Sequence, residues 1–293
     1  MARYSIKDLE ELSGIKAHTI RIWEKRYGVI VPDRTETNIR LYSDDDLKKL
    51  LNISILNKHG LKISHLSKLT QSELREKVIH ISRDSTEAGI HIENLTIAML
   101  ELDEWKFDKI LSDSIIRIGF EETLVRLIHP FFEKIGLLWL TGSINPAQEH
   151  FVSNLLRQKL IVAIDGQAPV TREKPISFIL FLHEEELHEL GLLFYSYLLK
   201  RNGINVIYLG QAVPFEDLEK IVQIRKADYF LTSFTTGITE KDLRDYLMKM
   251  SETYPEQVIF YTGYQISKIN GSLPANLVRL DSIKQFQDII RTL

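Results

Sequence analysis

The chain has 293 residues, of which 44% are hydrophobic and 26% charged, a composition typical of folded domains and not of disordered segments. It contains no cysteine, which excludes disulfides and thiolate metal sites and fits a reducing compartment. The N-terminal residues carry charges throughout, and the longest apolar runs, such as Ile176–Leu182, are far too short to span a bilayer. We therefore expect a cytoplasmic protein with no membrane partner.

The net charge of −3 is unevenly distributed. Residues 1–75 contain 14 Lys and Arg against 10 Asp and Glu, a balance of +4, and the remainder has a balance of −7. A basic end on an acidic body is typical of a DNA-reading module joined to a domain with another role.

Two short helices joined by a tight turn are predicted at the start of the chain. Ser5, with Asp8 three residues on, is a capping box that opens the first helix, and Gly14 ends it. The second helix runs from about residue 18 to 27 and ends before Gly28. Such a pair can present its second helix to the major groove of DNA.

A loop and further helices follow. Residues 32–39 show no periodicity and predict an exposed wing. Ser43 and Asp46 form a second capping box, which opens a helix that ends near residue 59. Two shorter helices extend to about residue 82.

The segment 83–165 predicts a helical bundle. Apolar residues recur every three or four positions, and Pro130 and Pro146 punctuate the pattern, which gives four helices. No heptad helix of about 30 residues follows the first region, so a long dimerising coiled coil is not expected.

Strands alternate with helices after the weakly apolar linker 165–175. This alternation predicts a parallel sheet with helices on both faces, whose ligands sit at the carboxyl ends of the strands. The strands are expected at 176–182, 205–209, 229–233, 258–261 and 277–280, and the helices at 187–201, 215–225, 240–251 and 283–292.

The second helix has a basic face. Arg21 and Lys25 lie four residues apart and share that face, and Arg34 and Arg40 flank the wing, where they can reach phosphates. On charge alone, a solvated basic helix in a small bundle is the simpler interpretation.

The order of the residues favours DNA binding. The segment resembles the MerR family of regulators in Tyr4-Ser5-Ile6, Gly14-Ile15, Thr19 to Gly28, Pro32 to Thr35 and Asn38 to Tyr42, over about 70 residues. Trp23 stands where many members carry Tyr, which we interpret as a packing change. The resemblance implies that the DNA-binding residues are His18, Thr19, Arg21, Lys25, Arg26 and Tyr27 from the second helix, with Arg34, Arg40 and Tyr42 on the DNA backbone.

A second motif follows the first predicted strand. His188 stands at a strand–helix junction, where sheets of this kind bind ligands. Glu186, two residues away, can orient its imidazole and raise its basicity as a metal ligand. Gly191 allows a close backbone approach. The alternative is a solvated acidic helix start, since Glu184, Glu185 and Glu186 all suit a helix N-terminus.

The wider pattern resembles the cobalamin-binding module shared by methionine synthase and corrinoid proteins. It consists of Glu186-x-His188-x-x-Gly191, then Ser233-Phe234-Thr235, then Thr262-Gly263, at the family's spacing. The resemblance implies that His188 is the lower ligand of cobalt. It also implies that the nucleotide tail of the cofactor lies beside Ser233, Thr235, Thr262 and Gly263, and we also place Gly210 at this site.

Three positions depart from the family pattern: Glu186 replaces Asp, Thr235 replaces Leu, and Thr262 replaces Gly. Glu186 keeps the carboxylate with one more methylene, and Thr262 can crowd the tail. The affinity for the cofactor therefore stays open.

Trp139 is followed ten residues later by Glu149-His150. This spacing resembles the helical-bundle cap of adenosylcobalamin-dependent photoreceptor regulators, and it implies that these side chains lie over the upper face of the cofactor. The alternative is a core aromatic and a surface charge. Leu140 follows Trp139 and cannot supply a second nitrogen ligand after the upper bond is broken.

These observations predict a multidomain α and α/β protein. It comprises a winged helix-turn-helix (1–75), a four-helix-bundle cap (83–165) and a doubly wound, Rossmann-like cobalamin-binding domain (175–293). We expect a DNA-binding regulator, not an enzyme, that forms homo-oligomers under the control of adenosylcobalamin. Two alternatives stay open: a regulator of the same type that acts through protein contacts without cobalamin, and a corrinoid methyl-transfer protein.

Overall fold

The computed structural model describes residues 4–35, 38–84, 88–140, 144–168, 176–235, 238–269 and 271–293, with the side chains of all these except 11–12, 79–84, 137–140 and 268. The chain divides into two compact units, Met1–Leu155 and Leu156–Leu293. No helix in the described part of the chain is long and apolar enough to cross a membrane.

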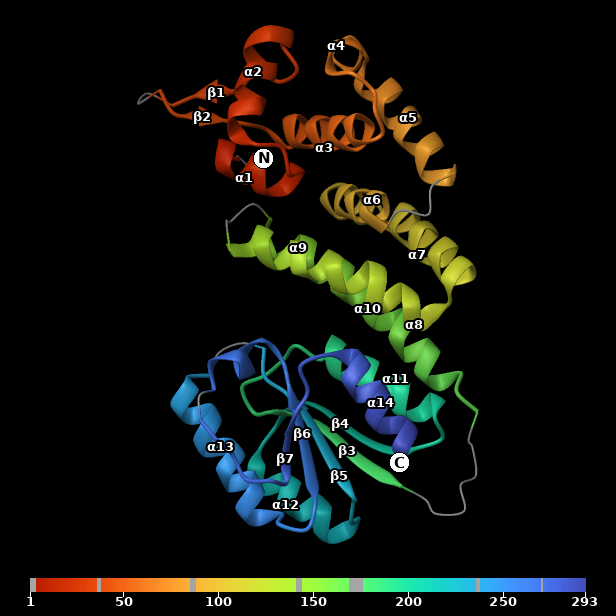
Figure 1. Ribbon diagram of the computed structural model, residues 1–293, viewed down its shortest axis with the longest axis vertical. Helices are drawn as coiled ribbons and strands as arrows, with labels where there is room; N and C mark the ends of the chain where they lie inside the picture. Colours follow the sequence, from red (N-terminus) through yellow and green to blue (C-terminus); the bar gives the residue numbers. More distant parts are fainter. Residues whose placement is uncertain are drawn as a thin grey trace. The chain divides into compact units, whose positions relative to one another are not determined.

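The first unit begins with the predicted pair of helices, α1 (Ile6–Ser13) and α2 (Ala17–Tyr27) (Figure 1). The predicted capping box is present, since Ser5 and Asp8 bond each other's backbone N–H groups. Gly14 and Gly28 end the two helices in the left-handed conformation, with φ of 69° and 61°. A two-residue pair of strands, β1 (Asp33–Arg34) and β2 (Arg40–Leu41), forms the wing.

Three helices complete this region: α3 (Asp44–Lys58), α4 (Ile63–Leu66) and α5 (Gln71–Asp84). The capping box of Ser43 and Asp46 opens α3 as predicted. The bundle follows with α6 (Ala88–Glu101), α7 (Glu104–Ile118), α8 (Phe120–Thr123), α9 (His129–Leu140) and α10 (Pro146–Asp165). A π-helical segment, Leu124–Ile128, joins α8 to α9.

The second unit contains a parallel sheet in which the described strands have the order β4-β3-β5-β6-β7. The strands are β3 (Ser177–His183), β4 (Asn205–Val213), β5 (Tyr229–Ser233), β6 (Val258–Thr262) and β7 (Leu277–Arg279). The helices are α11 (Leu190–Arg201), α12 (Phe215–Ile224), α13 (Glu240–Thr253) and α14 (Ile283–Thr292). The predicted doubly wound architecture is confirmed.

Helices cover both faces of the sheet. Alternate residues of β3 point to opposite faces, and both sets are apolar and buried. Ile179 and Phe181 belong to a core that includes Leu218 of α12 and Leu247 of α13. On the other side, Phe178 contacts Phe286 of α14 edge-to-face at 6.3 Å. Figure 1 shows α12 and α13 on one side of the strands and α11 and α14 on the other.

One predicted boundary is wrong in a way that matters for function. The helix expected from residue 187 begins at Leu190. The reason is that the carboxylate of Glu186 accepts hydrogen bonds from the backbone N–H groups of Leu187 and His188, which holds these residues outside the helix. Residues 186–189 therefore form a separate loop, and this loop carries His188.

Candidate functional site

The loop that carries His188 lies at the carboxyl edge of the sheet, beside its topological switch point. The strands β3 and β5 are neighbours, and the chain leaves them toward opposite faces of the sheet, to α11 and α13 (Figure 1). Open α/β sheets bind ligands at such a point. Glu186 follows β3 and Thr235 follows β5, and the Thr235 N–H donates to Glu186 Oε2 over 2.6 Å. This bond joins residues 49 positions apart.

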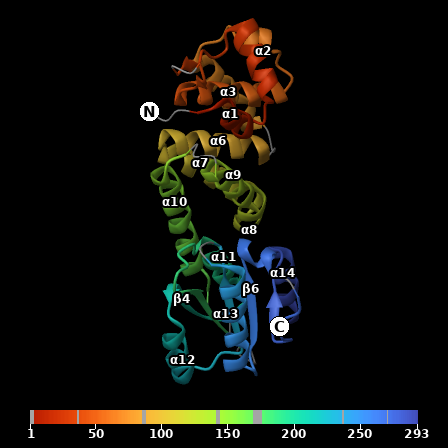
Figure 2. The ribbon, with the colours of Figure 1, turned by 90° about the vertical axis from the view of Figure 1, so that its left-hand side faces the viewer.

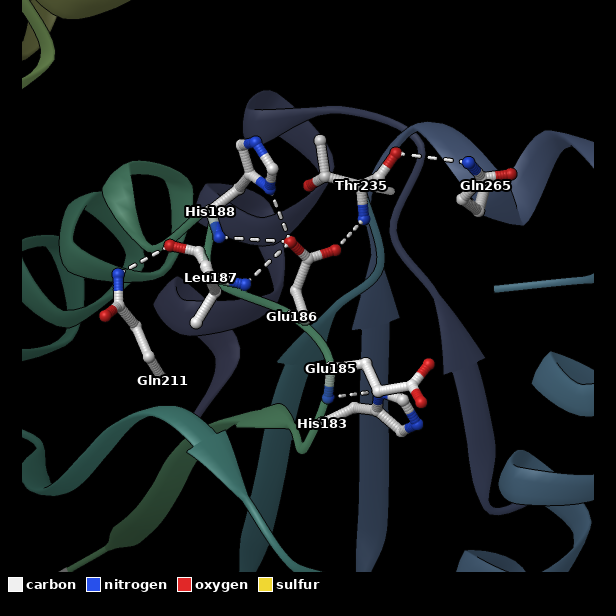
Figure 3. Close-up of polar contacts among 8 residues, drawn as sticks. All are labelled: His183, Glu185, Glu186, Leu187, His188, Gln211, Thr235 and Gln265. Carbon is white, nitrogen blue, oxygen red and sulfur yellow. Dashed lines mark hydrogen bonds and ion pairs between the residues drawn. The ribbon is translucent and has the colours of Figure 1, made fainter. Parts of the chain in front are cut away.

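Glu186 is the centre of the polar network (Figure 3). Its side chain is only 2% exposed. Oε1 accepts from the N–H groups of Leu187 at 3.1 Å and His188 at 3.0 Å, and it lies 2.6 Å from His188 Nδ1. A buried carboxylate requires such compensation, because an unpaired charge out of water is very costly. The alternative of a solvated acidic helix start is therefore wrong for Glu186.

His188 is oriented by this carboxylate. An acceptor at Nδ1 favours the tautomer that carries the proton on Nδ1, which places the lone pair on Nε2. The side chain is 56% exposed, and Figure 3 shows the ring at the outer side of the loop. His183, at the end of β3, points away from it toward another part of the domain. Histidines that ligate metals are commonly held by a carboxylate in this way.

Gly263 is required by close backbone packing. Its φ is +107°, and a Cβ there would lie 2.3 Å from the carbonyl oxygen of Phe234. Any side chain would force the loops after β5 and β6 apart. Gly210 also has a positive φ, +81°, and its Cβ would contact the Tyr208 ring at 3.4 Å.

At Gly191 no other part of the described chain makes a close approach. A Cβ there would meet no described atom within 4 Å, so the chain itself does not demand glycine. Gly191 is exposed in the first turn of α11, three residues after His188. Its small size leaves open space beside that loop.

The remaining predicted residues of the lower site lie on β5, β6 and the loop after β5. Ser233 is buried and pairs in register with Thr262. The Thr262 hydroxyl donates to the carbonyl of Leu280 over 3.1 Å, so it is occupied by an internal bond. The backbone N–H of Thr235 donates to Glu186, so this contact does not depend on whether the side chain is Thr or the Leu of the family pattern.

Sequence reasoning missed several supporting residues. Glu189, 7% exposed, accepts from Arg157 Nε over 2.5 Å and from the Tyr208 hydroxyl over 2.9 Å. Gln211 donates to the carbonyl of Leu187, and Gln265 donates to that of Thr235. No local pattern marks these residues, because each acts on a partner at least 19 positions away.

The predicted cap residues come from the first unit. The side chains of Trp139 and Leu140 lie outside the described residues. Glu149 ends the first turn of α10 and His150 follows it; Glu149 accepts from Ser153, and its Oε2 lies 3.6 Å from His150 Nε2. The His150 side chain is 72% exposed.

Most of the predicted DNA-facing residues lie on the outer side of α2, but Tyr27 lies between the positions of the buried Trp23 and Ile20 around the helix. His18, Arg21, Lys25 and Arg26 are exposed, Thr19 and Tyr27 are half-buried, and the guanidinium of Arg26 lies 5.5 Å from the Tyr27 ring centre. Trp23 is 8% exposed, in agreement with a packing role. Glu10 accepts from the Ala17 N–H and pairs with Lys16, which fixes the start of α2.

The wing residues divide into two kinds. Arg34 is exposed and donates to Asn38 Oδ1. Arg40 donates to both oxygens of Glu24 at 3.2 Å, and Tyr42 is 1% exposed with its hydroxyl bonded to Glu24. Burial and the charge of Glu24 raise the pKa of Tyr42 to about 12. The structure therefore places Tyr42 under the wing as a support, and not on the surface where a phosphate contact was expected.

Comparisons with known proteins agree with this arrangement. Residues 4–73 match the model of the MerR HTH family regulatory protein, and residues 91–163 match the model of the B12 binding domain. The chain thus carries a MerR-type helix-turn-helix joined to a cobalamin-binding region, the make-up of a DNA-binding transcription regulator.

Two curated relatives match most of the chain. It is 29% identical to the HTH-type transcriptional repressor CarH of Myxococcus xanthus, over 89% of this chain and 88% of CarH. It is 26% identical to the repressor CarA of the same organism, over 75% and 73%. The monomethylamine corrinoid protein of Methanosarcina barkeri shares the fold, with 12% identity and a TM-score of 0.54 over 71% of this chain and all of that protein.

Proposed function

We propose that this protein is a transcriptional repressor whose oligomeric state and DNA affinity are controlled by bound adenosylcobalamin. The observation that carries the proposal is the pairing of His188 with the buried carboxylate of Glu186 at the carboxyl edge of a corrinoid-type sheet. The similarity to the repressors CarH and CarA supports the regulatory part.

The residues present fit the cofactor. His188 would ligate cobalt through Nε2, and Glu186 would hold the ring in the tautomer that leaves this nitrogen basic. The loops that Gly263 and Thr235 draw together would receive the nucleotide tail, beside Ser233, Thr262 and Gly210. Gly191 would leave room for the corrin ring, because no other described part of the chain lies within 4 Å of the position that a Cβ would take there.

On the upper face, Trp139, Glu149 and His150 would surround the adenosyl group. When bound, adenosylcobalamin supplies a cobalt–carbon bond that light can break. Leu140 offers no nitrogen, so the light-adapted state of this protein would lack an upper histidine ligand from that position.

On DNA, the exposed face of α2 would enter the major groove through Arg21 with His18, Thr19, Lys25, Arg26 and Tyr27, and Arg34 and Arg40 would contact the backbone. A two-fold operator needs two such helices about one helical turn apart. Because the sequence has no long heptad helix, assembly through the cobalamin-binding part would supply the pairing. We propose no catalytic role for the chain.

The test is to purify the protein with adenosylcobalamin in the dark and record its absorption spectrum and elution volume before and after light. We expect bound corrinoid, a larger species in the dark, and loss of that species in light. His188→Ala should lose the cobalt–histidine signature, whereas His129→Ala, which changes an exposed histidine on α9, should not.

A gel shift on the protein's own upstream DNA, in dark and light, connects the cofactor to repression. Tighter binding in the dark with cofactor is expected. No bound corrinoid would favour a regulator that acts through protein contacts, and methyl transfer to a thiol by the purified chain would favour a corrinoid methyl-transfer protein.

A further inference from the structure

The helices α3 and α6 each contain a stretch that is buried on all sides. In α3, every residue from Leu50 to Leu56 is buried, and in α6 every residue from Glu93 to Leu100 is buried. A run of seven or eight residues covers the whole circumference of a helix, so each must be covered from more than one direction. We call α1–α5 the recognition module.

The two buried helices contact each other. α3 packs against α1 and α5 of the recognition module on one side and against α6 of the bundle on the other, and α1 also contacts α9. Figures 1 and 2 both show α6 between the recognition module and α7 and α9. The recognition module and the bundle therefore share one apolar core.

Two carboxylates of α6 stand at the edges of this shared core. Glu93, with a side chain 8% exposed, accepts from Lys58 Nζ of α3 over 2.6 Å. Its other oxygen, Oε2, is buried with no hydrogen-bond partner among the described residues. Burial lowers the pKa of Lys134 of α9, and the charge of Glu93 acts in the opposite direction.

Glu101, with a side chain 15% exposed, repeats this arrangement at the other end of α6. It pairs with Arg75 of α5, and its second oxygen lies 3.7 Å from Lys106 Nζ of α7. Glu101 thus stands between a cation of the recognition module and a cation of the bundle, and Glu93 joins the bundle helix α6 to a cation of the recognition module.

Apolar packing holds two helices together but tolerates sliding and rotation, whereas a partly buried ion pair is satisfied in one register only. We infer that the recognition module packs on α6 in one fixed orientation. Glu93 and Glu101 set this orientation and, with it, the direction in which α2 faces DNA. In an oligomer on a two-fold operator, the contact between the recognition module and α6 decides whether two recognition helices meet successive major grooves. The inference does not depend on cobalamin.

The test measures the distance between the recognition module and the bundle. Because the chain has no cysteine, spin labels can be attached to Ile22→Cys on α2 and Ile116→Cys on α7, whose side chains are exposed. The test variant Lys58→Gln/Arg75→Gln removes the two cations of the recognition module that pair with Glu93 and Glu101 of α6. The control variant Lys220→Gln/Arg126→Gln also removes two cations, but their partners Asp217 and Glu122 lie only three and four residues away in the chain.

We expect a single narrow distance distribution in the parent and the control, and a broadened distribution or a second peak in the test variant. Far-UV circular dichroism and thermal melting establish that both variants fold. An unchanged distribution in the test variant would overturn the role of the two carboxylates. A broad distribution in the parent would overturn the inference that the recognition module has one fixed orientation on α6.

Operator binding supplies the second readout. The test variant should bind operator DNA roughly fivefold or more weakly than the control, at the lower end of typical coupling between sites. Both variants have lost the same positive charge, so equal affinities would contradict the inference. This comparison is made without cobalamin and is thus separate from the fate of the proposed cofactor.

Discussion

Glu186→Gln tests the network on which the proposed cobalt ligand depends. In the folded protein, Oε1 faces three donors and Oε2 faces the Thr235 N–H at 2.6 Å. A glutamine has one acceptor oxygen and one NH2 group, so in either orientation its NH2 must face a backbone N–H. The substitution therefore loses at least one hydrogen bond and leaves a buried donor unsatisfied, which costs about 1–3 kcal/mol of the free energy of unfolding.

The stability assay is urea denaturation of the cofactor-free protein, and the matched control is Glu185→Gln at the exposed neighbouring position. The control should leave the free energy of unfolding within about 0.5 kcal/mol. Glu186→Gln should also weaken cobalamin binding by roughly 10–100-fold, because the imidazole loses its carboxylate partner. Unchanged stability would refute the network, and lost stability with unchanged cobalamin affinity would refute its role in ligation.

Four further outcomes follow from single contacts. Gly263→Ala should destabilise the second unit by roughly 3 kcal/mol or more, because its Cβ overlaps the Phe234 backbone, whereas Gly191→Ala should leave its thermal stability intact. Arg157→Gln should cost about 1 kcal/mol in urea denaturation, a modest value because Arg157 is half exposed, and a cost near zero would show that Glu189 is satisfied without it. The Tyr246 hydroxyl is buried with no hydrogen-bond partner among the described residues, so Tyr246→Phe should raise the unfolding free energy by about 1 kcal/mol. Burial raises the pKa of Tyr246 above the ordinary value of 10.0, so the unfolded chain releases this proton at a lower pH than the folded protein does. The unfolding free energy therefore does not depend on this group below pH 10 and falls as the pH rises from there toward the higher folded-state pKa, and alkaline denaturation of the Phe variant should lack this fall. Finally, Arg21→Ala should weaken operator binding by about 1–3 kcal/mol with lower discrimination between sequences, and an equal loss on unrelated DNA would reduce Arg21 to a phosphate contact.

Much of the fold could be predicted because its signals are local. A capping box links residues three apart, as in Ser5 with Asp8, and it forms wherever the helix begins. The alternation of apolar runs with helical periodicity likewise predicts the parallel sheet, and the observed strands β5 and β6 begin at the predicted residues.

The candidate site was only partly predictable. The Glu186–His188 contact spans two residues, so the motif itself points to it. The bond from Thr235 and the support of Glu189 by Arg157 join distant segments, and no periodicity or spacing specifies such partners. Tyr42 shows the same limit: its family position suggested a surface contact, but packing against α2 buries it beneath the wing.

Local sequence patterns specify the order of the elements, the recognition helix with its exposed basic face, and the histidine motif at the end of β3. These properties follow from neighbours along the chain, whose geometry the backbone fixes. The folded arrangement of distant segments is what buries Glu186, excludes a side chain at Gly263, and joins α3 and α6 in one core. Those outcomes depend on how strands register and helices pack, because burial and close approach belong to pairs of segments and not to either segment alone.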